Sequence, residues 1–246
     1  MKKTLAMLLT ATLVFGVTAC GNSMNTPSEK SVIPSDPTQT SVLESSSPEI
    51  SKQLETDLRS EVIQEETNSN ILVAYFSWAD NAILEDDVDA VSSPSVIAPG
   101  NVQELAGWVQ EETGGDLFSI RVAEPYSSDW DECLARAHQE RGDHARPALM
   151  EPVENLDQYN TVFLGYPNWW YGVPMALLTF LEETDLSGKQ VYLFCSHGTG
   201  GLANSVELIT EAVPGTTICN NIFDCYEEEA PFSQADIQRW VSELGY

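Results

Sequence analysis

The sequence is poor in basic residues. It has 11 Lys and Arg against 38 Asp and Glu, which gives a formal net charge of −27 over 246 residues. From residue 70 onward only six basic residues face 29 acidic ones. Because nucleic-acid binding requires Lys and Arg to neutralise phosphates, this composition argues against a nucleic-acid partner. The negative charge either serves solubility or forms a docking surface for a basic protein.

Cysteine and histidine are also scarce, with five and three residues. No CxxC pair and no Cys/His spacing typical of a metal site occurs, so none is predicted. Cys133 and Cys195 fall in expected elements, where a buried free thiol is usual. Cys219 and Cys225 would lie about 20 Å apart on one extended strand, too far for a disulfide. We expect no bridge between them unless a turn intervenes.

Several catalytic motifs are missing. The chain has no GxSxG nucleophile elbow, no P-loop lysine and no GxGxxG dinucleotide fingerprint. These absences argue against a P-loop enzyme and a dinucleotide-binding Rossmann domain, and leave a hydrolase as the weakest alternative.

The one long apolar run lies at the N-terminus, over residues 5–17, behind Lys2 and Lys3. It is too short to span a membrane and is typical of a secretory signal. It ends in Val-Thr-Ala-Cys20, which resembles the lipobox of bacterial lipoproteins. This resemblance implies a signal peptide over residues 1–19, cleavage before Cys20 and a lipid on its sulfur. The protein is therefore expected to be exported and lipid-anchored to the extracytoplasmic face of a bacterial membrane.

Residues 20–69 are rich in Ser, Thr, Pro and Glu and contain no aromatic residue. Such a segment buries too little apolar surface to offset its ordering entropy, so we expect a disordered tether behind the anchor. Residues 70–246 have the size of one compact domain.

Within that domain, apolar β-rich runs alternate with helical patterns. This alternation predicts an α/β fold with a doubly wound, five-stranded parallel sheet in the order 2-1-3-4-5. The expected strands are 71–76, 117–122, 161–166, 191–195 and 216–223, and the expected helices are 102–112, 131–139, 175–183, 203–213 and 234–244. In this order the loops after the first, third and fourth strands meet at one edge, where ligands bind in open α/β sheets.

The three loops carry distinctive residues: Ser77, the aromatic stretch from Gly165 to Gly172, and the Ser196-His197-Gly198 turn. With Asn101 at a helix start and the 145–148 stretch, they make residues 70–244 resemble a flavodoxin, in particular bacterial flavodoxin-like domains with a GYPxWW pattern. The resemblance implies bound FMN. It also implies an electron carrier, or an FMN-dependent oxidoreductase of the NAD(P)H/quinone type. Its partner would be a redox protein, which the acidic surface suggests is basic, or a small quinone-like acceptor.

The first loop of a flavodoxin cradles the FMN phosphate. Ser77 and Trp78 match its beginning, and Asn101 and Val102 match its end, but residues 79–99 are inserted between them. Pro99 and Val102 replace two hydroxyls. Each lost hydrogen bond is worth about 0.5–1.5 kcal/mol, so FMN binding could weaken by about one to two orders of magnitude. The inserted segment would compensate if Ser92, Ser93 or Ser95 reached the site, whereas its five carboxylates would oppose a phosphate: Asp80, Glu85, Asp86, Asp87 and Asp89.

The other two loops supply the expected ring site. Asn168 would hydrogen-bond the flavin, and Trp169 or Trp170 would stack on it, while the other tryptophan belongs to the core. His197 would hydrogen-bond the ring or neutralise its reduced form. The resemblance assigns these loops the cofactor-binding residues Pro167, Asn168, Trp169, Trp170, Tyr171, Ser196, His197, Gly198 and Gly201.

Three further candidates lie outside these loops. Arg146 either reaches the site or forms a surface ion pair, and His138 and His144 are expected to be exposed. The alternative to a flavin protein is a surface binding module that kept the fold and lost the FMN phosphate site.

Overall fold

The computed structural model describes residues 69–84 and 93–246. The predicted signal peptide, Cys20 and the tether lie outside these residues, as does Ser92. No helix within them is long and apolar enough to cross a membrane.

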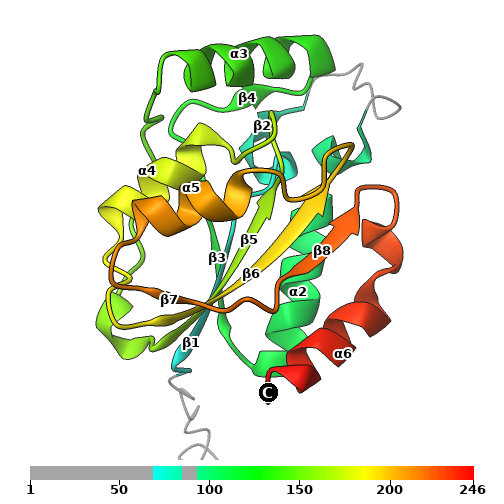
Figure 1. Cartoon of the computed structure of the whole chain (residues 1–246). Helices are drawn as coiled ribbons and strands as arrows, with labels where there is room; N and C mark the ends of the chain where they lie inside the picture. Colours follow the sequence, from blue (N-terminus) through cyan, green and yellow to red (C-terminus); the bar gives the residue numbers. More distant parts are fainter. Residues whose placement is uncertain (1–68, 85–92) are drawn as a thin grey trace, which may run out of the picture. The chain divides into compact units, whose positions relative to one another are not determined.

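The domain is built on a parallel sheet (Figure 1). Its path is β3-β1-β5-β6-β7, and β8 also pairs with β6. Counted along the chain, this is the predicted order 2-1-3-4-5. The strands are β1 (Ile71–Tyr75), β3 (Asp116–Ser119), β5 (Thr161–Pro167), β6 (Gln190–His197), β7 (Thr217–Ile218) and β8 (Phe223–Tyr226).

The prediction of one last strand over 216–223 is wrong. After Ile218 the chain leaves β6 and rejoins it at Phe223, which lies opposite Phe194. The polar stretch between them turns outward, and the Asn221 carbonyl accepts a hydrogen bond from the Trp240 indole at 3.2 Å. The strand therefore ends three residues later than predicted.

Helices cover both faces of the sheet (Figure 1). One face packs against α2 (Asn101–Thr113) and α6 (Gln234–Glu243), and the other against α4 (Met175–Glu183) and α5 (Ser205–Ala212), while α3 (Trp130–Gly142) lies beyond the carboxyl ends of the strands. Because strand side chains alternate, Val73 and Phe163 point toward α2 and α6, and Leu72 and Leu164 toward the other layer.

The N-termini of α3 and α6 differ in their capping. Asp129 caps α3 and accepts a hydrogen bond from the Glu132 amide at 2.9 Å. Ser233 precedes α6, but its hydroxyl donates to the Glu229 carbonyl at 2.9 Å and caps nothing. The helix predicted over 203–213 is shorter, because Ala203 has a positive φ of 43°.

The inserted segment contains ordered structure that the sequence did not reveal. A 3₁₀ turn (Ala79–Asn81) leads into β2 (Ala82–Ile83), which pairs with β4 (Tyr126–Ser127). The Asn81 amide donates to the carbonyls of Ser77 and Ile120 and accepts from the Val122 amide at 2.8 Å. Further 3₁₀ turns are Pro94–Val96, Leu156–Gln158 and Ala230–Phe232.

Gly165 lies at a point of close packing in the sheet. It pairs with Phe194 across β5 and β6, and a Cβ on Gly165 would overlap the Phe194 ring. We expect Gly165→Ala to lower the free energy of unfolding by about 1–3 kcal/mol, because the fully buried ring must shift.

Urea denaturation measures this effect, with Gly107→Ala as the control. Gly107 lies in α2, and a Cβ there would have no neighbour within 4 Å, so alanine should stabilise the helix by about 0.5–1 kcal/mol. A Gly165→Ala variant as stable as the parent would contradict the close packing.

Candidate functional site

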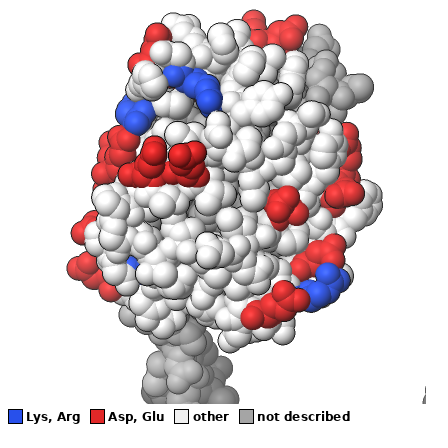
Figure 2. Space-filling view, in the orientation of Figure 1, with Lys and Arg blue, Asp and Glu red and all other residues white. Residues whose placement is uncertain are grey.

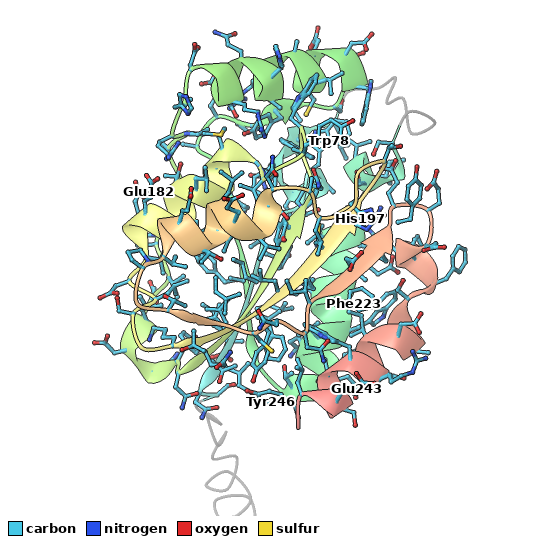
Figure 3. All side chains as sticks on the ribbon, viewed as in Figure 1. Trp78, Glu182, His197, Phe223, Glu243 and Tyr246 are labelled. Carbon is cyan, nitrogen blue, oxygen red and sulfur yellow. The ribbon has the colours of Figure 1, made fainter. Side chains whose placement is uncertain are left out.

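The loops after β1, β5, β6 and β8 meet around one cleft of about 400 Å³ at the carboxyl edge of the sheet. Figure 3 labels Trp78 and His197, which reach this edge from two of these loops. Every residue predicted for the site except Gly201 lines the cleft, namely Ser77, Trp78, Asn101, Val102, Pro167, Asn168, Trp169, Trp170, Tyr171, Ser196, His197 and Gly198.

One end of the cleft lies at the start of α2. The Ser77 hydroxyl is buried there and has no hydrogen-bond partner. Gly100 is the N-cap of the helix and has no side chain to cap it. A Cβ at this position would lie only 2.5 Å from Ser77 Oγ and 2.7 Å from the Ser95 carbonyl oxygen. Unpartnered donors at the start of a 13-residue helix fit an anion.

Further hydroxyls lie at the same end. Ser93 and Ser95 line the cleft, with their oxygens 2.7 Å apart. Two of the three serines expected to replace the lost hydroxyls of the first loop therefore line the cleft. Asp80 is turned away, because its carboxylate accepts a hydrogen bond from Ser119 at 2.5 Å. The other four acidic residues of the insertion lie outside the described residues.

Two asparagine side chains tie the loops together. Asn101 donates to the Glu227 carbonyl at 2.8 Å and lies 3.4 Å from the Ser196 hydroxyl. Asn168 donates through its side chain to the Gly201 carbonyl and through its backbone to the Ser196 carbonyl. Gly201 therefore contributes by holding Asn168, although it does not line the cleft.

The aromatic loop forms the opposite wall. Trp169 packs edge-to-face on Phe76 and Tyr126, with ring centroids 5.5 and 5.3 Å apart, so it is the tryptophan anchored in the core. Trp170 and Tyr171 are exposed and have φ values of 52° and 59°. Bulky residues rarely adopt this conformation, which costs about 1–3 kcal/mol and tends to occur at functional sites.

His197 is held between two acceptors. Its Nδ1 lies 3.0 Å from the Gly198 carbonyl and its Nε2 lies 2.9 Å from the Asp224 carboxylate. Both partners can only accept hydrogen bonds, so the ring satisfies both when each nitrogen carries a proton. The two hydrogen bonds fix the orientation of the imidazole at the end of β6.

Glu227 is a carboxylate in the wall of the cleft that the sequence did not indicate. Burial raises its pKa, and repulsion from Glu228 adds to this effect, whereas His197 acts in the opposite direction. The last strand was predicted to end at residue 223, so Tyr226 and Glu227 were not expected at the site. The strand ends at Tyr226, which brings both residues to the sheet edge.

Trp130, Leu134 and Thr199 also line the cleft unpredicted. Trp130 directly follows the Asp129 cap, so an aromatic residue at the first position of a helix was the available signal. Nothing in the sequence indicated that α3 would lie over the sheet edge.

The remaining candidates lie elsewhere. Arg146 forms a two-pronged ion pair with Glu182, with distances of 2.8 and 2.6 Å, and does not reach the cleft. The hydrogen bonds to Glu182 raise the pKa of Arg146. His138 and His144 are exposed, and the His138 ring lies 4.7 Å from that of Trp170.

The four cysteines among the described residues are free thiols. Burial raises the pKa of Cys133 to about 12 and that of Cys225 to about 11, and the pKa of Cys195 is raised well above its ordinary value for the same reason. The buried thiols of Cys133, Cys195 and Cys225 are therefore poor nucleophiles. Within residues 69–84 and 93–246 no cluster of His, Cys, Asp and Glu could hold a metal ion.

The comparisons with known proteins agree with this geometry. The family model described as Flavodoxin matches residues 91–244, and the chain belongs to this family. No curated protein matches the chain.

Two solved structures with TM-scores above 0.5 share the fold, and a third is similar at a lower score. An inferred flavoprotein from Bacteroides eggerthii DSM 20697 is 27% identical with a TM-score of 0.54, and the match covers 72% of this chain and 98% of that one. Another from Bacteroides uniformis ATCC 8492 is 24% identical with a TM-score of 0.51, covering 70% and 97%. A flavoprotein from Lactobacillus acidophilus NCFM, solved in complex with FMN, is 16% identical with a TM-score of 0.48, covering 67% and 97%.

Glu227 predicts a pH-dependent stability. Since its folded-state pKa is raised, the folded protein binds more protons than the unfolded chain between the two pKa values, and the free energy of unfolding falls as pH rises through that window. Glu227→Gln should therefore be more stable than the parent at neutral pH and equally stable below pH of about 4, where free Glu is protonated.

Urea denaturation from pH 4 to 8 measures the difference, which should be small because Glu227 is partly exposed. Glu211→Gln at an exposed position of α5 makes the same chemical change outside the cleft and is the control. A Glu227→Gln variant less stable at pH 7 would contradict the assigned direction.

Proposed function

We propose that the chain binds FMN in the cleft and transfers electrons, as an electron carrier or as an FMN-dependent oxidoreductase. The observation that carries this proposal is the buried, unpartnered Ser77 hydroxyl beside Gly100 at the start of α2. A native protein rarely leaves a buried hydroxyl unpaired, so a ligand that accepts its hydrogen bond is favoured.

The residues fit the two ends of FMN. Ser77, Ser93 and Ser95 with the free amides of α2 would hold the phosphate. Trp170, beside the core-anchored Trp169, would hold the isoalloxazine ring, and the His197 imidazole would lie at the end of β6 in the same cleft. When bound, FMN supplies the redox chemistry, and the protein orients it and sets the charge around it.

The rival hypothesis, a binding module without a phosphate site, is less well supported. It predicts that the first loop has lost the hydroxyls that would bind a phosphate. Pro99 and Val102 have no hydroxyl, but Ser93 and Ser95 do, and both line the cleft. Glu227 in the wall of the cleft opposes negative charge there, and this is the observation that favours the rival hypothesis.

FMN binding to the full-length chain can be followed by quenching of flavin fluorescence. Ser77→Ala should weaken binding about ten- to a hundredfold, because a hydrogen bond to a charged group is worth about 1.5–3 kcal/mol. Protein stability should not fall, since this hydroxyl is unpaired in the free protein.

Riboflavin, which lacks the phosphate, is the matched control. Its binding should be equal in the Ser77→Ala variant and the parent. If the parent chain quenches the fluorescence of neither flavin, the proposed function is wrong. If Ser77→Ala weakens both flavins equally, Ser77 does not contact the phosphate.

We also propose that the protein is lipid-anchored through Cys20 on the outer face of a bacterial membrane, where it meets a basic redox protein or a small quinone-like acceptor. The support is the signal-like N-terminus and the acidic surface, on which Asp and Glu outnumber Lys and Arg in the face shown (Figure 2).

The anchor predicts that Cys20→Ala releases the protein. After expression in a bacterium, the parent should sediment with membranes and take up labelled palmitate, whereas the variant should do neither. A Cys219→Ala variant controls for loss of any cysteine and should behave like the parent. Membrane association that survives Cys20→Ala would contradict a lipid anchor.

A further inference from the structure

A groove separate from the cleft runs between β8 and α6. Its volume is about 510 Å³, and the buried side chains of Phe223, Cys225 and Trp240 line it. Figure 3 labels Phe223 on β8 and Glu243 on α6, which line the groove from the strand and from the helix. None of the described residues that line this groove also lines the cleft. The groove is therefore a second surface, outside the site where we place FMN.

The groove is acidic. Of the described residues that line it, one is basic, Arg239, and four are acidic, namely Asp224, Glu229, Asp236 and Glu243. Arg239 already pairs with Asp236 at 2.9 Å, and both side chains are more than half exposed. Burial raises the pKa of the Cys225 thiol to about 11, and repulsion from three of these carboxylates contributes to the rise. Negative charge therefore converges on the groove and favours a positively charged occupant.

The strand that borders the groove has an unpaired edge. Among the described strands, β8 pairs with β6 alone. The Glu227 amide donates to the His197 carbonyl at 2.8 Å, and successive residues of a parallel strand direct their backbone groups to alternate sides. The backbone groups of Asp224 and Tyr226 therefore face away from β6. The Tyr226 carbonyl accepts from the Glu229 amide at 2.9 Å, which leaves the Asp224 amide and carbonyl and the Tyr226 amide without a partner in the described part of the chain.

Free backbone groups beside an acidic groove fit an extended segment of another chain. In strand addition, main-chain hydrogen bonds to a sheet edge provide affinity, and alternate side chains provide specificity. Side chains directed toward α6 would meet Glu229, Asp236 and Glu243, so Lys or Arg is favoured at alternate positions. Phe232 also lines the groove and is 84% exposed, so it offers an apolar contact to the segment.

We propose that the groove between β8 and α6 binds an extended segment of another protein, rich in Lys or Arg, which adds as a strand to β8. A second copy of this chain is a poor occupant, since the same carboxylates would then face each other. The proposal goes beyond the proposed function and does not rest on it, because no redox group takes part. The alternative is that the carboxylates only guard an exposed edge against unwanted strand pairing.

The test is isothermal titration of the flavin-free, full-length chain with the peptide acetyl-Lys-Val-Lys-Val-Lys-Val-amide. The matched control is acetyl-Lys-Pro-Lys-Pro-Lys-Pro-amide, which has the same charge but cannot complete a β-ladder, because proline has no N–H. The lysine–valine peptide should bind about tenfold more tightly or better, and its affinity should fall as the salt concentration rises.

Variants of the chain locate the binding surface. Glu229→Gln combined with Glu243→Gln removes two carboxylates of the groove and should weaken binding of the lysine–valine peptide about threefold or more. Glu207→Gln combined with Glu211→Gln removes the same charge from exposed positions of α5 and should bind the peptide like the parent. Phe232→Ala changes an exposed residue, so the variant should fold, and it should also bind the peptide about threefold more weakly or worse.

Hydrogen exchange followed by NMR distinguishes strand addition from simple charge attraction. The amides of Asp224 and Tyr226 should exchange about tenfold more slowly or better when the lysine–valine peptide is bound, because each would then donate to the added strand.

Four results would overturn the proposal: no binding of the lysine–valine peptide, equal binding of the two peptides, equal effects of the two double variants, or unchanged exchange at both amides. FMN binding is measured on the same preparation. If the peptide binds and FMN does not, the groove stands and the proposed function fails. If FMN binds and the peptide does not, the docking proposal alone is wrong.

Discussion

The site depends on parallel pairing of β1, β5 and β6. Parallel strands bring their carboxyl ends to one edge, so Ser77, the tryptophan loop and His197 must meet, although about 120 residues separate the first from the last. The pairing is close enough that only a glycine at position 165 fits against Phe194. Asn101 and Asn168 then join the loops that the strands deliver.

The two halves of the cleft use different physics. At the α2 end, hydroxyls and free amides present donors without a formal positive charge. The other end presents aromatic surface, and the backbone of Trp170 and Tyr171 there has positive φ angles. The His197 imidazole lies between two hydrogen-bond acceptors at the same end. An anionic group with an attached flat ring matches both halves.

Much of the fold was predictable from the sequence. The strand–helix alternation predicted the sheet order. The range of α4 matches residue by residue, because a continuous apolar run follows Pro174 there and ends at the acidic pair Glu182–Glu183. One continuous strand was wrongly predicted over 216–223, because the interruption in its pairing with β6 leaves no signal in the apolar pattern of the sequence. The β2–β4 ladder was missed because two-residue strands are too short to show alternation.

The sequence by itself determined that the loops after β1, β5 and β6 would meet, since the order of parallel strands decides which ends lie side by side. It also determined the chemistry of the tryptophan loop, whose residues are contiguous. Only the tertiary structure decided that Ser93 and Ser95 approach Ser77, that His197 pairs with Asp224, and that α3 packs against Trp169 and Trp170. These contacts join residues from different elements, and no local pattern encodes where an inserted segment or a helix beyond the sheet edge will pack.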